Sequence, residues 1–120
     1  MNNSDAAFTL FLAMGLVDGD FQNNEGDQAL SSLGKLGLGL PDNPGTIVKR
    51  VAANDTDLLF AAGKHVSDWS TKEKLAMVTE MSRVAHADND FDESEMKFIV
   101  LFASMWGLEK DSVLEATFNR

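Results

Sequence analysis

Two short acidic segments hold the residues of this chain that are best suited to chemistry. Those acidic residues are Asp18, Asp20 and Glu25 in the first segment and Asp88, Asp90, Asp92 and Glu95 in the second. Carboxylates crowded into a small volume repel one another, and Ca²⁺ or Mg²⁺ relieves the repulsion because these ions prefer oxygen ligands. If the two segments lie side by side, the sequence predicts a divalent cation site with all seven as ligands.

The second segment opens as D-x-D-x-D, like the start of an EF-hand calcium loop. It departs from that loop because the glutamate arrives at the eighth position and the required glycine is missing. We therefore expect weak binding, with a dissociation constant on the order of 10⁻⁴ to 10⁻³ M. His86 could join the site, although a structural role is the simpler expectation for it.

Helix capping is the alternative explanation of these acids. Asp92 and Glu95 have the spacing of a capping box, and Asp18 and Asp88 could bond backbone N–H groups of their own turns. Acids near helix N-termini also follow from the helix dipole. Capping does not require Asp20 or Asp90, so both interpretations stay open.

The two acidic segments belong to an internal repeat. The stretch Asp18–Glu25 aligns with Asp88–Glu95, seventy positions later, and Leu36-Gly37-Leu38 aligns with Trp106-Gly107-Leu108. Two copies of helix, acidic turn and helix are too few for a solenoid. We expect one domain over residues 1–120, with pseudo-symmetric halves at about 4–40 and 70–120 joined by short helices over 43–68.

The repeated segment resembles the signature of the TerB-like family of tellurite-resistance proteins. The signature is alanine or valine, then D-[G/N]-x-[hydrophobic]-x-x-x-E, present here as Val17–Glu25 and Ala87–Glu95. The resemblance implies an all-helical fold with the two acidic turns close together. It also implies divalent metal binding in some members, and a role in stress-response or membrane-associated complexes. Asn89 replaces the usual glycine, and asparagine tolerates the same backbone conformation.

The apolar pattern predicts an all-α chain of about seven helices and no strand. The run Phe98–Trp106 is polar only at Ser104, so we expect this helix in the middle of the fold. Local signals mark helix ends: Ser4 or Asp5 as the first cap, Asn43-Pro44, a capping box at Ser70–Glu73, and Gly107 as a C′ residue.

Composition excludes several functions. The chain of 120 residues has no cysteine, which excludes a disulfide frame, a thiolate metal site and thiol catalysis. The net charge of −9 opposes nucleic-acid binding and favours cations or basic partners. The apolar run Ala6–Val17 is shorter than the roughly 20 residues of a membrane span, so any membrane association would come through a partner.

No catalytic motif is present, so we expect a cytoplasmic, non-enzymatic stress-response module that binds a divalent cation, a protein partner or both. The alternative is a metal-free helical adaptor whose acidic face meets basic residues of a partner. A hydrolase that uses a carboxylate-bound metal is a third hypothesis with less support.

Overall fold

A computed structural model describes residues 1–16, 23–86 and 93–118, and this part of the chain contains helices and no strand. The helices are α1 (Asn3–Leu16), α2 (Asn23–Lys35), α3 (Pro44–Ala52), α4 (Thr56–Val66), α5 (Thr71–His86), α6 (Glu93–Met105) and α7 (Lys110–Phe118). The predicted all-α class is confirmed.

The central helix is α1. Every residue from Ala6 to Gly15 is buried, and the helix packs against α2, α3, α4 and α5. A helix surrounded in this way must be apolar around its whole circumference, and the only polar side chain in the buried run is Thr9. The hydroxyl of Thr9 donates to the backbone carbonyl of Asp5 at 2.7 Å, which satisfies it inside the core.

The predicted central position of the run Phe98–Trp106 is wrong, because α6 lies at the rim. It packs against α5 and α4, while Val100 and Leu101 are 44% and 51% exposed. A run of apolar residues shows that a helix has apolar sides, but the number of neighbouring helices decides how many sides are covered. Here the covered side is the one that carries Ile99, Phe102 and Ala103.

Several predicted helix ends are confirmed by their hydrogen bonds. At the start of α5, the Ser70 N–H donates to Glu73 Oε1 at 3.0 Å, and the Glu73 N–H donates to Ser70 Oγ at 3.1 Å. This is the reciprocal capping box. Gly107 has a φ of +72°, the left-handed conformation expected of a C′ residue.

Two predicted caps differ from the structure. The first helix is capped by Asn2, whose Oδ1 accepts the Asp5 N–H at 2.8 Å, because the helix begins earlier than the Ser4 or Asp5 cap requires. Asn43 is the N-cap of α3 and Pro44 follows it as predicted, but the Asn43 side chain makes no capping hydrogen bond. Proline at the first helical position has no N–H to leave unsatisfied, and its fixed φ already suits the helix.

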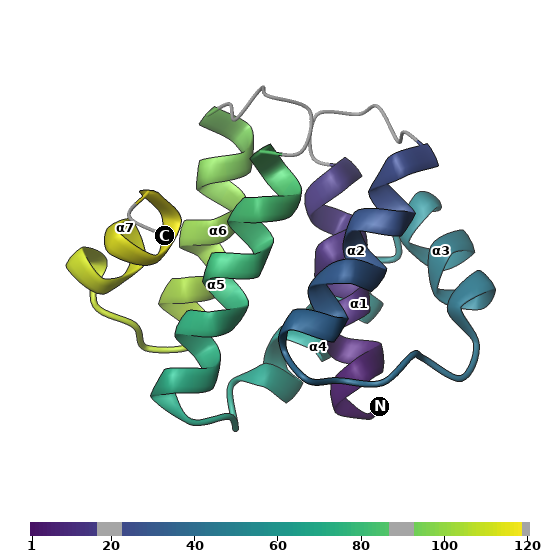
Figure 1. Cartoon of the computed structure of the whole chain (residues 1–120), viewed down its shortest axis with the longest axis horizontal. Coiled ribbons are helices and arrows are strands. Elements are labelled where there is room, and N and C mark those ends of the chain that lie inside the picture. Colours follow the sequence, from purple (N-terminus) through teal and green to yellow (C-terminus); the bar gives the residue numbers. More distant parts are fainter. Residues whose placement is uncertain (17–22, 87–92, 119–120) are drawn as a thin grey trace.

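The helices that flank the two acidic turns form neighbouring antiparallel pairs. Figure 1 shows α1 running beside α2 and α5 beside α6, with α3, α4 and α7 around them. The pairs are joined through α5, which packs against α1 and α2 as well as α6. None of the described helices is long and apolar enough to cross a bilayer.

Candidate functional site

The ends of four helices meet at one end of the molecule. Leu16 ends α1, Asn23 begins α2, His86 ends α5 and Glu93 begins α6. Figure 1 shows these four helix ends at the same edge of the fold. The packing of α5 against α1 and α2 accounts for this arrangement, since it sets the two helix pairs beside each other.

Most of the predicted metal ligands lie outside the described residues. These are Asp18 and Asp20 in the first turn and Asp88, Asp90 and Asp92 in the second. Glu25 belongs to the first turn of α2, but its side chain also lies outside the described part. The convergence of these six carboxylates therefore stays a prediction.

Glu95 is the predicted ligand whose side chain the structure describes. It lies in the first turn of α6 and is 3% exposed, so it is directed into the fold. Its neighbour Glu93 has a side chain that is 84% exposed and forms an ion pair of 3.3 Å with Lys97. The two glutamates of this turn thus have opposite environments.

The burial of Glu95 has an electrostatic consequence. Removing a carboxylate from water costs free energy unless polar or positive groups compensate. The first turn of a helix supplies part of that compensation, because its free N–H groups and its dipole favour an anion. A side chain held in this way has little freedom to move, which suits a metal ligand and a capping residue equally.

The two histidines have different positions. His65 Nε2 lies 2.7 Å from the side-chain oxygen of Asn3, and the Trp69 indole donates to the same oxygen at 3.1 Å. These contacts join His65 of α4 to Asn3 at the start of α1. His86 is the last residue of α5 and therefore lies at the end of the molecule where the acidic turns begin.

The described residues do not form a metal site by themselves. Within residues 1–16, 23–86 and 93–118, no group of three histidine, aspartate or glutamate side chains is placed to hold an ion.

Sequence reasoning missed one buried acid. Glu80, on α5, has a side chain that is only 8% exposed and lies 3.5 Å from Arg83 Nε through its Oε2. Its spacing of three residues from Met77 and four from Val84, both apolar, was a signal that the sequence did contain.

One comparison with known proteins finds a matching protein family. The family model described as "Tellurite resistance protein TerB" matches residues 4–117. No curated protein and no solved structure matches the chain.

Proposed function

Because this chain belongs to the TerB family of tellurite-resistance proteins, we propose that it is a non-enzymatic stress-response module that binds a divalent cation between its two acidic turns. The loaded turns then form a stiff surface for a protein partner. The single observation that carries the proposal is the meeting of the four flanking helix ends at one end of the molecule.

The chemistry of the seven residues favours a hard cation. They offer only carboxylate oxygens, which Ca²⁺ and Mg²⁺ prefer over nitrogen or sulfur ligands. Glu95 supports the proposal because its buried carboxylate already has a fixed position at this end. The ion would also offset the mutual repulsion of these carboxylates.

A metal-free adaptor is the second candidate function, and a specific observation favours it. Acids at two other helix starts in this chain act as caps: Asp55 Oδ1 accepts the Leu58 N–H at 3.1 Å, and Glu73 accepts the Ser70 N–H. The acids of the two turns could serve their helices in the same way and present their remaining charge to basic residues of a partner.

Thermal melting with Ca²⁺, Mg²⁺, Mn²⁺ or Zn²⁺ tests the cation proposal. A ligand present at a hundred times its dissociation constant stabilises the folded state by about 2.7 kcal/mol. We expect a shift of the melting temperature at millimolar Ca²⁺ or Mg²⁺ that is lost in an Asp88→Asn/Glu95→Gln double variant.

The matched control is Glu93→Gln, which removes an exposed acid from the same helix turn. It should keep the ion-dependent shift, even if its melting temperature without ions changes. No shift in the native protein at millimolar ion, or an equal shift in the double variant, rejects the cation site and leaves the adaptor.

A further inference from the structure

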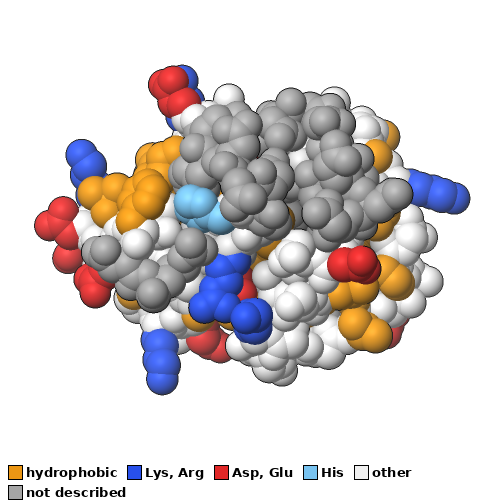
Figure 2. Space-filling view, turned by 45° about the horizontal axis from the view of Figure 1, so that its top comes forward, with side chains coloured by type: hydrophobic (Ala, Val, Ile, Leu, Met, Phe, Trp, Pro, Cys, Tyr) orange, Lys and Arg blue, Asp and Glu red, His pale blue; other side chains and the backbone are white. Residues whose placement is uncertain are grey.

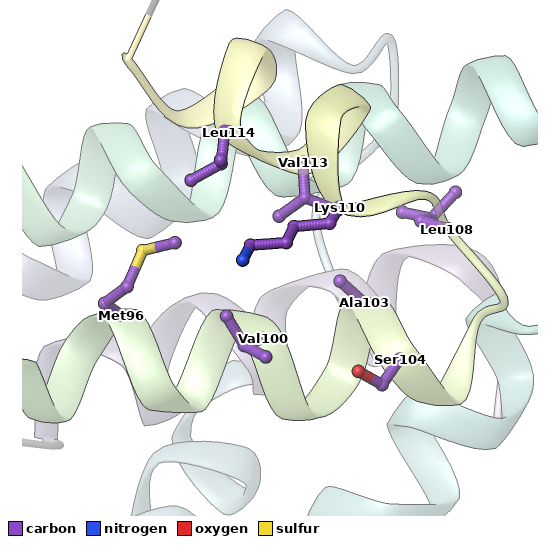
Figure 3. A pocket seen from close by; sticks show the side chains of 8 residues that line it. All are labelled: Met96, Val100, Ala103, Ser104, Leu108, Lys110, Val113 and Leu114. Atoms are coloured by element: carbon purple, nitrogen blue, oxygen red, sulfur yellow. The ribbon is translucent and has the colours of Figure 1, made fainter.

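A groove of about 240 Å³ lies between α6 and α7. Figure 3 shows the side chains that line it: Met96, Val100, Ala103 and Ser104 from α6, Leu108 from the connecting segment, and Lys110, Val113 and Leu114 from α7. The groove exists because α6 and α7 each pack on α5, so their facing sides are not closed against each other.

The walls of the groove are apolar and reach the surface. Val100 is 44% exposed on one wall and Leu114 is 36% exposed on the other. Figure 2 shows hydrophobic side chains gathered at the surface beside this helix pair. Covering such walls with an apolar ligand removes hydrocarbon from water, which is favourable in proportion to the area covered.

One cation lies across this apolar groove. Figure 3 shows the side chain of Lys110 extending between the helices, with its amino group directed toward Met96. Among the described residues, Lys110 forms no ion pair. It is also the first residue of α7, where the helix dipole disfavours a positive charge, so helix stability does not explain the lysine.

The shape of the groove limits its occupant. On α6 the lining runs from Met96 to Ser104, a distance of about 12 Å at 1.5 Å per residue. The volume is below the range of about 300–1,000 Å³ that is usual for drug-sized ligands. A space of this volume, lined along about two turns of α6, suits one alkyl chain better than a ring system or an entire helix.

We propose that this groove binds a free fatty acid of medium chain length, with the alkyl chain between α6 and α7 and the carboxylate paired with Lys110. The apolar walls account for the alkyl chain. The Lys110 ammonium group, which has no ion-pair partner within the described part of the chain, accounts for the carboxylate. This proposal is independent of the cation site, because the two sites share no residue.

Decanoate below its micelle concentration is the probe. Titration of the full ¹⁵N-labelled chain, followed by ¹H–¹⁵N spectra, should give saturable shifts at groove residues of α6 and α7. Decanol should bind through its chain alone, and decyltrimethylammonium should bind more weakly than decanol because Lys110 repels its head group.

Two variants separate the head-group contact from the groove. Lys110→Met keeps the aliphatic stem and should weaken decanoate binding about two- to fivefold, the range for an exposed ion pair, without affecting decanol. The matched control Lys97→Met removes another exposed lysine of this region, one that pairs with Glu93, and should leave decanoate binding unchanged.

Ser104→Trp fills the groove from an exposed position and should abolish the binding of both decanoate and decanol. Its circular dichroism spectrum and melting temperature establish that the variant is folded. Several results would overturn the proposal: no saturable shifts with decanoate, equal decanoate affinity in Lys110→Met, shifts confined to other helices, or binding only to anionic phospholipid vesicles.

Discussion

The indole N–H of Trp106 donates a hydrogen bond of 2.8 Å to the backbone carbonyl oxygen of Gly63. Trp106 directly follows α6 and is 3% exposed, and Gly63 is a buried residue of α4. The ring of Phe102, one turn before Trp106, lies 6.0 Å from the indole between ring centroids. This hydrogen bond and these rings hold the rim helix α6 against α4.

Trp106→Phe should destabilise the protein by about 1–3 kcal/mol, because it keeps an aromatic ring but removes the donor to a buried carbonyl. The free energy of unfolding in urea measures this loss. Trp69→Phe is the matched control, since the Trp69 indole donates to Asn3 at an exposed position where water can replace it. Equal losses in the two variants would show that the buried hydrogen bond is not the cause.

Gly63→Ala tests the close approach of the same two helices. An added Cβ at Gly63 would lie 2.5 Å from Phe102 Cε1 and 3.1 Å from Met105 Sδ. Phe102 is 1% exposed and cannot move away without disturbing the core. We expect a loss of about 1–3 kcal/mol in the free energy of unfolding, as is usual for overpacking.

Gly34→Ala is the control for that substitution. Gly34 lies in α2, and an added Cβ there meets no atom within 4 Å. Alanine should stabilise the helix by about 0.5–1 kcal/mol, because it has less conformational freedom to lose on folding. If Gly63→Ala also raised the free energy of unfolding, as we expect of Gly34→Ala, α4 and α6 would be able to separate easily.

The features that the sequence could predict are local ones. The Ser70–Glu73 capping box, the Asn43-Pro44 start and the Gly107 end each depend on residues within one helix turn. Such patterns specify their own hydrogen bonds or backbone conformation, so no knowledge of the rest of the fold is needed. The number and type of the helices could be predicted from these local patterns.

The features that the sequence could not predict depend on neighbours that are distant in the chain. The runs Ala6–Gly15 and Phe98–Met105 are both apolar, but only the first is surrounded by four helices. The candidate site shows the same limit. Spacing predicted Glu95 as a metal ligand or a capping residue, which stays a prediction. Its burial beside the exposed Glu93 is set by how α6 packs.

The stability that Glu73 provides should depend on pH. Its hydrogen bonds with the backbone and side chain of Ser70 lower the pKa of Glu73 below the usual 4.5. The folded state therefore favours the carboxylate form. The resulting stabilisation is present above the pKa of the unfolded chain and is lost as the pH falls through the lower pKa of the folded chain.

Urea unfolding of the native protein and of Glu73→Gln, from about pH 7 to about pH 3, measures this effect. The native protein should be the more stable at neutral pH, and the difference should shrink in acid. Glu115→Gln, which makes the same substitution at an exposed position of α7, is the control. If the difference in free energy of unfolding between the native protein and Glu73→Gln stays constant with pH, the charge of the capping glutamate contributes nothing.

Glu80→Met should stabilise the protein. Glu80 Oε1 is buried and has no hydrogen-bond partner among the described residues, and its Oε2 has only the 3.5 Å contact with Arg83. Methionine fills a similar volume without a charge to desolvate, and replacing poorly compensated buried ions with apolar residues often gains about 1–4 kcal/mol. Because the Arg83 side chain is 40% exposed, water can solvate it after the change, and we expect a gain of about 1 kcal/mol in urea unfolding.

Two further variants separate charge from volume at this position. Glu80→Ala removes the charge and also leaves a cavity, so it should be less stable than Glu80→Met. Arg83→Met removes the only described ion-pair partner of Glu80 and should cost about 1–3 kcal/mol, because it leaves the buried carboxylate uncompensated. If Glu80→Met is instead destabilised as much as Arg83→Met, the carboxylate of Glu80 contributes a favourable interaction to the folded state.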